Sequence, residues 1–151
     1  MKTIKMLFVL FFLIFIIPDF LSAQDIRVHY FIGKSKSDVI KKYGNPVHQD
    51  NSNKEMMCMF YQTKTNRMIF VSDKTGVYQS EATANYNSET KARNVVDDFI
   101  AESVADGFAV DTISANDFQL HKSSIKADLQ ISKNKITKNF DVKVKASRSE
   151  D

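Results

Sequence analysis

The sequence predicts an α+β fold, an antiparallel β-sheet with two helices packed on one face. Two segments, 35–44 and 88–107, carry apolar residues at the spacing of a helix, and each is followed by short segments that alternate between apolar and polar residues. Helices that precede runs of antiparallel strands cover one face of a single sheet. The order of elements therefore also suggests that one helix-then-strands unit occurs twice, although the residues themselves do not visibly repeat.

Residues 1–23 are predicted to be a secretory signal peptide. Lys2 and Lys5 precede an unbroken apolar run over residues 6–17, and a short polar end follows it up to Ala23. We expect cleavage after Ala23. The alternative, a retained membrane anchor, is less favoured because a membrane-spanning helix needs about 20 apolar residues. The chain is therefore predicted to be exported, either periplasmic or secreted, with no transmembrane span after cleavage.

The rest of the chain is predicted to be one domain, residues 24–146, with residues 147–151 as a disordered polar tail. A chain of 151 residues that loses such a signal has enough length for one core and too little for two. The net charge is only +3, so there is no electrostatic reason to expect a nucleic-acid partner.

The first unit begins with residues 24–32, whose alternation predicts a half-buried strand. Ser35 then has the position of a helix N-cap, and Asp38 completes a capping box. Gly44 and Pro46 end this first helix. Residues 47–54 are polar and are predicted to form a loop. Three strands are expected next, at 55–62, 67–72 and 77–86.

The second helix has an N-cap at Ser88 and a stop at Gly107. Its apolar residues form one continuous stripe, and acidic residues dominate the opposite faces, which indicates a helix that packs on a core rather than one that lies on a membrane. Three strands are expected after it, at 108–114, 124–132 and 136–146, whereas 117–122 is either a short strand or a loop.

Cys58 is the only cysteine, so an internal disulfide is excluded. It lies inside an apolar predicted strand, where a thiol usually acts as a small, inert hydrophobic group. The alternative is a reactive thiol or an intermolecular disulfide.

The sequence contains no recognisable catalytic, nucleotide-binding or metal-binding motif. The three histidines, His29, His48 and His121, are far apart and have no paired ligands at metal-site spacing. Asp73 with His121 is the closest approach to a catalytic pair, and it rests on residue types alone. We therefore predict no enzyme activity, no cofactor and no metal, and we assign no site residues.

Six lysines of the final predicted strands could form a basic strip that meets lipid headgroups or an acidic polysaccharide. The alternative is that they protect an edge strand from pairing with other chains. These residues are Lys126, Lys133, Lys135, Lys138, Lys143 and Lys145.

The stretch from Gly33 to Pro46, with its Ser cap, Val39, Ile40, Gly44 and final Pro, resembles exported modules of the SmpA/OmlA and β-lactamase-inhibitor-protein-like (BLIP-like) superfamily. The resemblance continues through the following hairpin and covers residues 33–77. It implies a helix-on-sheet module that binds other proteins in the cell envelope. The lipid-bearing cysteine of the SmpA type is absent here, and the second half of the chain does not match the motif.

Three functions follow as hypotheses, of which an envelope hydrolase is the least favoured and would require a polar cleft that gathers His and carboxylate side chains. The first is a non-catalytic binding module that recognises a protein or an envelope component through its sheet face or its loops. The alternative is a carrier of a small ligand or lipid, with a pocket lined by Ala82, Ala84 and the methionines Met56, Met57 and Met59. The sequence does not identify the partner, the ligand or the oligomeric state.

Overall fold

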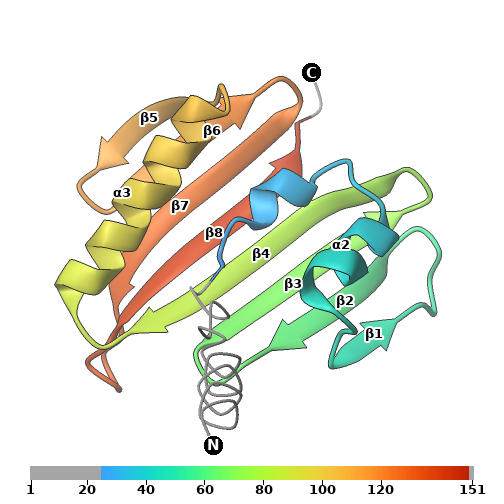
Figure 1. Cartoon of the computed structure of the whole chain (residues 1–151), viewed down its shortest axis with the longest axis horizontal. Helices are drawn as coiled ribbons and strands as arrows, with labels where there is room; N and C mark the ends of the chain where they lie inside the picture. Colours follow the sequence, from blue (N-terminus) through green and yellow to red (C-terminus); the bar gives the residue numbers. More distant parts are fainter. Residues whose placement is uncertain (1–24, 150–151) are drawn as a thin grey trace, which may run out of the picture.

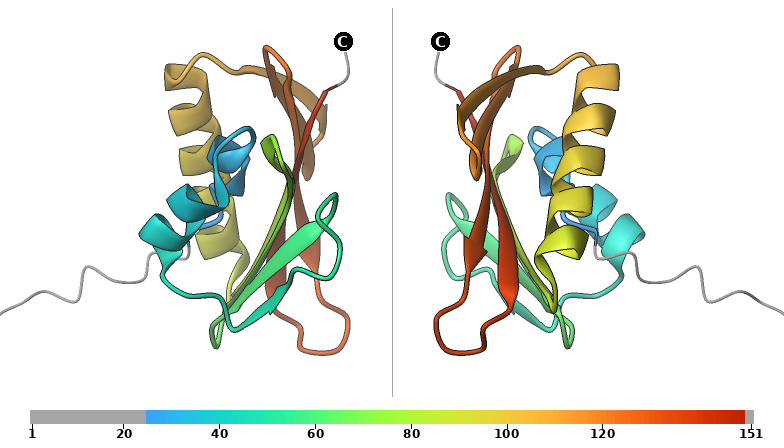
Figure 2. Two further views of the ribbon diagram at one scale, coloured as in Figure 1. Left: turned by 90° about the vertical axis from the view of Figure 1, so that its right-hand side faces the viewer. Right: turned by 90° about the vertical axis from the view of Figure 1, so that its left-hand side faces the viewer.

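The computed structural model describes residues 25–149, so the predicted signal peptide and the last two residues lie outside the described part. Within these residues, an eight-stranded antiparallel sheet carries the helices on one face, which confirms the predicted α+β fold (Figures 1 and 2). The helices are η1 (Val28–Phe31), α2 (Lys36–Tyr43) and α3 (Glu89–Ala105). The strands are β1 (His48–Asp50), β2 (Met57–Gln62), β3 (Asn66–Asp73), β4 (Gly76–Tyr86), β5 (Ala109–Ser114), β6 (Asp117–Lys122), β7 (Ile125–Lys133) and β8 (Phe140–Arg148).

The sheet consists of two meanders that join at its centre. Its strand order is β1-β2-β3-β4-β8-β7-β6-β5, so each unit is a helix followed by four strands in sequence. The last strands of the two units, β4 and β8, lie antiparallel side by side, with Ala82 opposite Val144. The repeated helix-then-strands unit expected from the sequence is therefore present, and β1 and β5 form the two edges.

Both helices begin at the residues that the sequence indicates. At α2 the Ser35 hydroxyl accepts the Asp38 backbone N–H, and the Asp38 carboxylate accepts the Ser35 backbone N–H, which completes the capping box. At α3 the Ser88 hydroxyl accepts the Lys91 backbone N–H. The apolar stripe of α3 faces the sheet, with Ala92, Val96 and Phe99 buried.

The core lies between the sheet and the helices. Every second residue of the inner strands points toward the helices and is buried, because side chains alternate between the two faces of a sheet. The resulting set includes Met59, Met68, Phe70, Ala82, Ala84, Ala127, Leu129, Ile131, Val142, Val144 and Ala146. Phe70 is its largest fully buried side chain, and its ring packs against Phe31, Tyr43 and Tyr61.

The strand predicted at 24–32 is wrong, since Val28–Phe31 forms a 3-10 helix. Two neighbouring residues, Val28 and His29, are both completely buried, and an extended strand on a one-sided sheet would have exposed one of them. The segment crosses the helix-bearing face between α2 and α3 (Figure 1), and the Ser80 hydroxyl donates to the Val28 carbonyl from β4 below.

Two boundaries also differ from the predictions, and one open alternative is decided. The loop expected at 47–54 contains the short edge strand β1, which pairs with β2. The ambiguous segment 117–122 is strand β6. The tail expected at 147–151 begins too early, because Ser147 pairs with Gln79 and Arg148 pairs with Ile125 inside the sheet. Both residues are polar, and only the pairing on either side shows that they belong to a strand.

Gly76 is the first testable position. Its φ is +120°, and a Cβ there would lie 2.8 Å from the Lys34 carbonyl oxygen, which accepts the Val77 N–H. Gly76→Ala should therefore strain the backbone and break this link between β4 and the segment after η1, at a cost of about 2–3 kcal/mol. The loss in free energy of unfolding is measured by urea unfolding, with circular dichroism as the signal.

Gly33→Ala is the matched control for this prediction. Gly33 also has a positive φ, +82°, but an added Cβ would meet nothing within 4 Å. Its cost should be the backbone strain alone, about 1 kcal/mol. Equal losses of stability in the two variants would contradict the role given to the Lys34 contact.

Candidate functional site

No helix among residues 25–149 covers the face of the sheet opposite α2 and α3, as the edge-on views show (Figure 2). We call it the open face. Because side chains alternate along a strand, the residues between the core residues point to this open face. Cross-strand register then sets which of them are neighbours, and the two units contribute different kinds of residue.

The first unit supplies an apolar patch, defined here as Cys58, Phe60, Ile69 and Val71. Phe60 pairs with Ile69 and Cys58 with Val71 across β2 and β3, so the four side chains form a compact block. All four are half-buried although no helix covers them. The ring of His48, on the edge strand β1, lies 5.5 Å from that of Phe60 and extends the patch.

The second unit, together with β4 of the first, supplies a charged half. Lys145 on β8 is flanked in register by Glu81 on β4 and Asp128 on β7. Lys143, two residues earlier, lies opposite Thr83 and Gln130. Cations and anions therefore alternate across the middle of the open face, and no single sign of charge dominates there.

A shallow depression of about 450 Å³ hollows this charged half. It extends over β4, β8, β7, β6 and β5, and Lys143, Lys145 and Asp128 are among the residues that line it. Ile113 on the edge strand also borders it and is 62% exposed, a large apolar side chain in a mostly polar surrounding. The open face thus has two neighbouring features. They are the apolar patch on β2 and β3, and a depression that Ile113 borders at the β5 edge.

The six lysines divide into two groups. Lys126, Lys143 and Lys145 lie on the open face, whereas Lys133, Lys135 and Lys138 lie at the end of β7 and in the loop after it. They form no continuous strip. The edge-protection hypothesis is wrong, because β7 and β8 are interior strands.

Cys58 belongs to the apolar patch and is a free thiol. Burial, together with the negative charge of Asp50, raises the pKa of this thiol, which keeps it protonated at neutral pH. The environment agrees with the interpretation of Cys58 as a small hydrophobic group.

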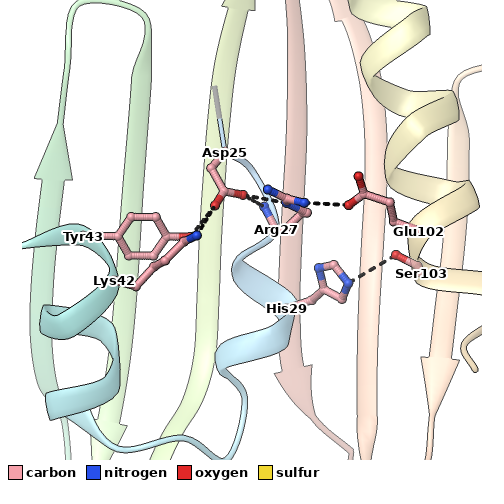
Figure 3. Close-up of polar contacts among 7 residues, drawn as sticks. All are labelled: Asp25, Arg27, His29, Lys42, Tyr43, Glu102 and Ser103. Atoms are coloured by element: carbon pink, nitrogen blue, oxygen red, sulfur yellow. Dashed lines mark hydrogen bonds and ion pairs between the residues drawn. The ribbon is translucent and has the colours of Figure 1, made fainter. Parts of the chain in front are cut away.

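On the helix side, a network of charged groups holds residues 25–27, which we call the N-terminal segment, between α2 and α3 (Figure 3). The Arg27 guanidinium donates to Glu102 at 2.7 Å and to Asp25 at 3.0 Å, and Lys42 lies 3.8 Å from the other Asp25 oxygen. Burial alone would raise the pKa of Asp25, but the hydrogen bonds and charge of Arg27 outweigh it and lower the pKa. Such half-exposed pairs are worth at most about 1 kcal/mol each.

His29 and Ser103 form a buried polar pair beside this network (Figure 3). The Ser103 Oγ lies 3.2 Å from the His29 Nε2, and the imidazole is enclosed by the rings of Tyr30, Phe99 and Phe108. Burial, and then the charge of Arg27, lower the pKa of His29 to about 4. A nucleophilic pair needs access to substrate, whereas both side chains are completely buried, so we assign the pair to the core.

The remaining candidate residues are not brought together. Asp73 is bound to Thr75 at the β3–β4 turn, whereas His121 on β6 lies 3.7 Å from Asp111, so the pair considered in the sequence does not form. Within residues 25–149 no group of three His, Cys, Asp or Glu side chains is placed as metal ligands would be. In the same part of the chain, no helix has the length and apolar character that a membrane crossing requires.

A larger hollow, which we call the helix-side groove, lies between the N-terminal segment and α3 and has a volume of about 850 Å³. The pocket expected from the sequence would instead have used Ala82, Ala84 and Met59, and this is wrong because all three are core residues outside both hollows. Met56 is exposed in the loop before β2, Met57 is half-buried at the start of that strand, and neither lines either hollow. No local pattern in the sequence indicates this groove, because its walls come from five separate segments.

Comparison with known proteins gives a limited result. No family model matches the sequence, and no curated protein matches it. Among solved structures, a cysteine-rich secretory protein from Staphylococcus aureus matches 84% of this chain with a TM-score of 0.45 and 9% sequence identity. An extracellular protein containing an SCP domain, from Bacillus anthracis, matches 84% with a TM-score of 0.46 and 13% identity. The chain spans about half the length of each, 47%.

Proposed function

We propose that this chain is an exported, non-catalytic binding module that recognises a protein partner of the cell envelope through its open face. The observation that carries the proposal is the apolar patch of Cys58, Phe60, Ile69 and Val71 on a sheet face without helices. Protein interfaces typically combine such an apolar centre with a polar rim. The charged half supplies the rim.

The partner's chemistry follows from the layout of this face. An apolar side chain or a short apolar ridge of the partner would lie on Phe60 and Ile69, and charged residues of both signs would meet the alternating Lys145, Glu81 and Asp128. Because the open face is nearly charge-balanced, the affinity should depend only weakly on salt, unlike that of a nucleic-acid-binding surface. The resemblance of residues 33–77 to exported protein-binding modules agrees with this proposal.

The test is an affinity capture of the chain from Gln24 onward, performed on an envelope extract with three baits. The unchanged protein should retain a stoichiometric partner, whereas Phe60→Lys with Ile69→Lys should lose it. The isolated partner should then bind the double variant at least about thirty-fold more weakly, a loss of about 2 kcal/mol, because charges replace the buried apolar contacts.

Asp97→Asn with Asp98→Asn is the matched control, because these acids lie on α3, which covers the other face of the sheet. The control should retain the partner with unchanged affinity. Equal loss from both variants, at equal thermal stability, would place the interface elsewhere. Retention by both would refute the role of the apolar patch.

A second function, binding of a small ligand, is favoured by a separate observation. The helix-side groove has a volume within the range of about 300–1,000 Å³ that is typical of ligand sites. It lies on the opposite side of the sheet, so both functions can operate in one molecule.

A further inference from the structure

The helix-side groove has defined walls. One wall is the N-terminal segment Asp25, Ile26 and Arg27, and the other is the face of α3 that carries Lys91, Val95, Asp98, Phe99 and Glu102. The end of β4 forms its floor. The β2–β3 turn, with Lys64 and Thr65, and Asn139 before β8 also border it.

The lining includes a set of apolar and aromatic groups. Ile26 and Phe99 are almost fully buried and continue into the core, and Tyr86 and Val95 are half-buried beside them. The Tyr86 hydroxyl is shielded from solvent and has no hydrogen-bond partner among the described residues. A buried polar atom without a partner is unusual, and here it belongs to a residue that borders an open space.

The charges that line the groove differ in whether they are already paired. Arg27 pairs with Asp25 and Glu102, and Lys42, which lies outside the lining, pairs with the other Asp25 oxygen, so these two cations and two anions balance. Lys64 and the Lys91 ammonium make no ion pair or side-chain hydrogen bond in the described part of the chain, and neither does Asp98. The unpaired charge in the groove is thus two cations against one anion.

We propose that the helix-side groove binds a small amphiphilic anion, an apolar chain or ring that ends in a carboxylate or a phosphate. The apolar part lies against Ile26, Tyr86, Val95 and Phe99, and the anionic group is bound by Lys64 and Lys91. This inference rests on the second function proposed above, and it is independent of the open face.

The experiment uses the chain from Gln24 onward and the fluorescent probe 8-anilinonaphthalene-1-sulfonate, itself an amphiphilic anion. We expect saturable binding of one probe per chain, displaced by dodecanoate or dodecyl phosphate. Dodecanol, which has the same apolar chain without the charge, should compete at least about ten-fold more weakly.

The variant Lys64→Gln with Lys91→Gln should weaken binding of both anions about ten-fold or more and leave the affinity for dodecanol unchanged. Its folding should be unaffected, because neither side chain has a partner to lose. Lys143→Gln with Lys145→Gln removes the same charge from the open face and should leave anion binding unchanged.

Three results would overturn the proposal. They are the absence of stoichiometric binding, equal competition by dodecanol and dodecanoate, and loss of binding only in the Lys143 and Lys145 variant. The last result would locate the anion on the open face. None of them bears on the capture experiment with the Phe60 and Ile69 variant, so the two functions fail separately.

Discussion

Phe70→Ala is expected to destabilise the fold by about 4 kcal/mol, the largest loss predicted for a single side chain. Phe70 is completely buried, and its ring lies 5.5–5.9 Å from the rings of Phe31, Tyr43 and Tyr61, which belong to three different segments. Truncation leaves a cavity that all three would have to fill together. Since a domain of this size is stable by about 5–15 kcal/mol, the variant should be close to unfolding.

Phe60→Ala is the control for this prediction. Phe60 lies on the neighbouring strand β2 and faces the open side, where it is only half-buried. Its replacement should cost about 1 kcal/mol, because solvent and neighbouring side chains can adjust to the loss. Urea midpoints from circular dichroism compare the two variants. A Phe70→Ala loss no larger than that of Phe60→Ala would contradict the packing of the aromatic cluster.

The second large effect is a loss of stability in acid caused by His29. Its pKa falls from 6.5, the ordinary value, to about 4 in the folded state, chiefly because the imidazole is buried. The unfolded chain therefore binds a proton at a higher pH than the folded chain does. The stability contributed by neutral His29 is fully present above pH 6.5 and is lost progressively as the pH falls toward 4. A shift of this size corresponds to roughly 3 kcal/mol.

Carboxylates also titrate in acid, so the measurement compares two proteins. In His29→Phe with Ser103→Ala, an aromatic ring stays in the pocket and no hydroxyl is left without its partner. The difference in free energy of unfolding between wild type and this variant should change by about 3 kcal/mol between pH 7 and pH 4. If the difference is constant across this range, His29 is not neutral and buried as described.

The helices were predictable because their signals are local. Ser35 and Asp38 cap each other's backbone N–H groups, and the Gly44 N–H donates to the Ile40 carbonyl four residues earlier, so the sequence contains the whole interaction. The same holds for Ser88 at α3. The strands of the second unit were predictable from alternation, although β8 begins at Phe140 rather than at 136, where a loop takes up the intervening residues.

The wrong predictions have a different cause. The conformation and position of these segments are determined by tertiary packing rather than by local sequence. Residues 24–32 alternate like a strand, but the space between α2 and α3 requires a turn that buries Val28 and His29 together. The lysines of β7 and β8 suggested an edge strand, and only the strand order shows that both strands are interior.

The candidate sites were less accessible to sequence analysis than the fold. Phe60 and Ile69 lie in strands that are apolar on both faces, so the sequence does not separate the residues of the open face from those of the core. The helix-side groove combines Asp25, Lys64, Lys91 and Asn139, whose proximity depends on the whole topology. No periodicity in the sequence indicates that these residues lie close together.

The pairing of β4 with β8 has a consequence for the order of folding. Each unit closes through hairpins between adjacent strands, which form rapidly, but Asn85 and Asp141 in the central pair are 56 residues apart in the chain. Contacts between such distant residues form slowly, because the entropy of closing the long loop opposes them. Until that step, each unit leaves its last strand, β4 or β8, unpaired on one side, so partly folded chains are exposed to intermolecular strand pairing at the seam between the two units.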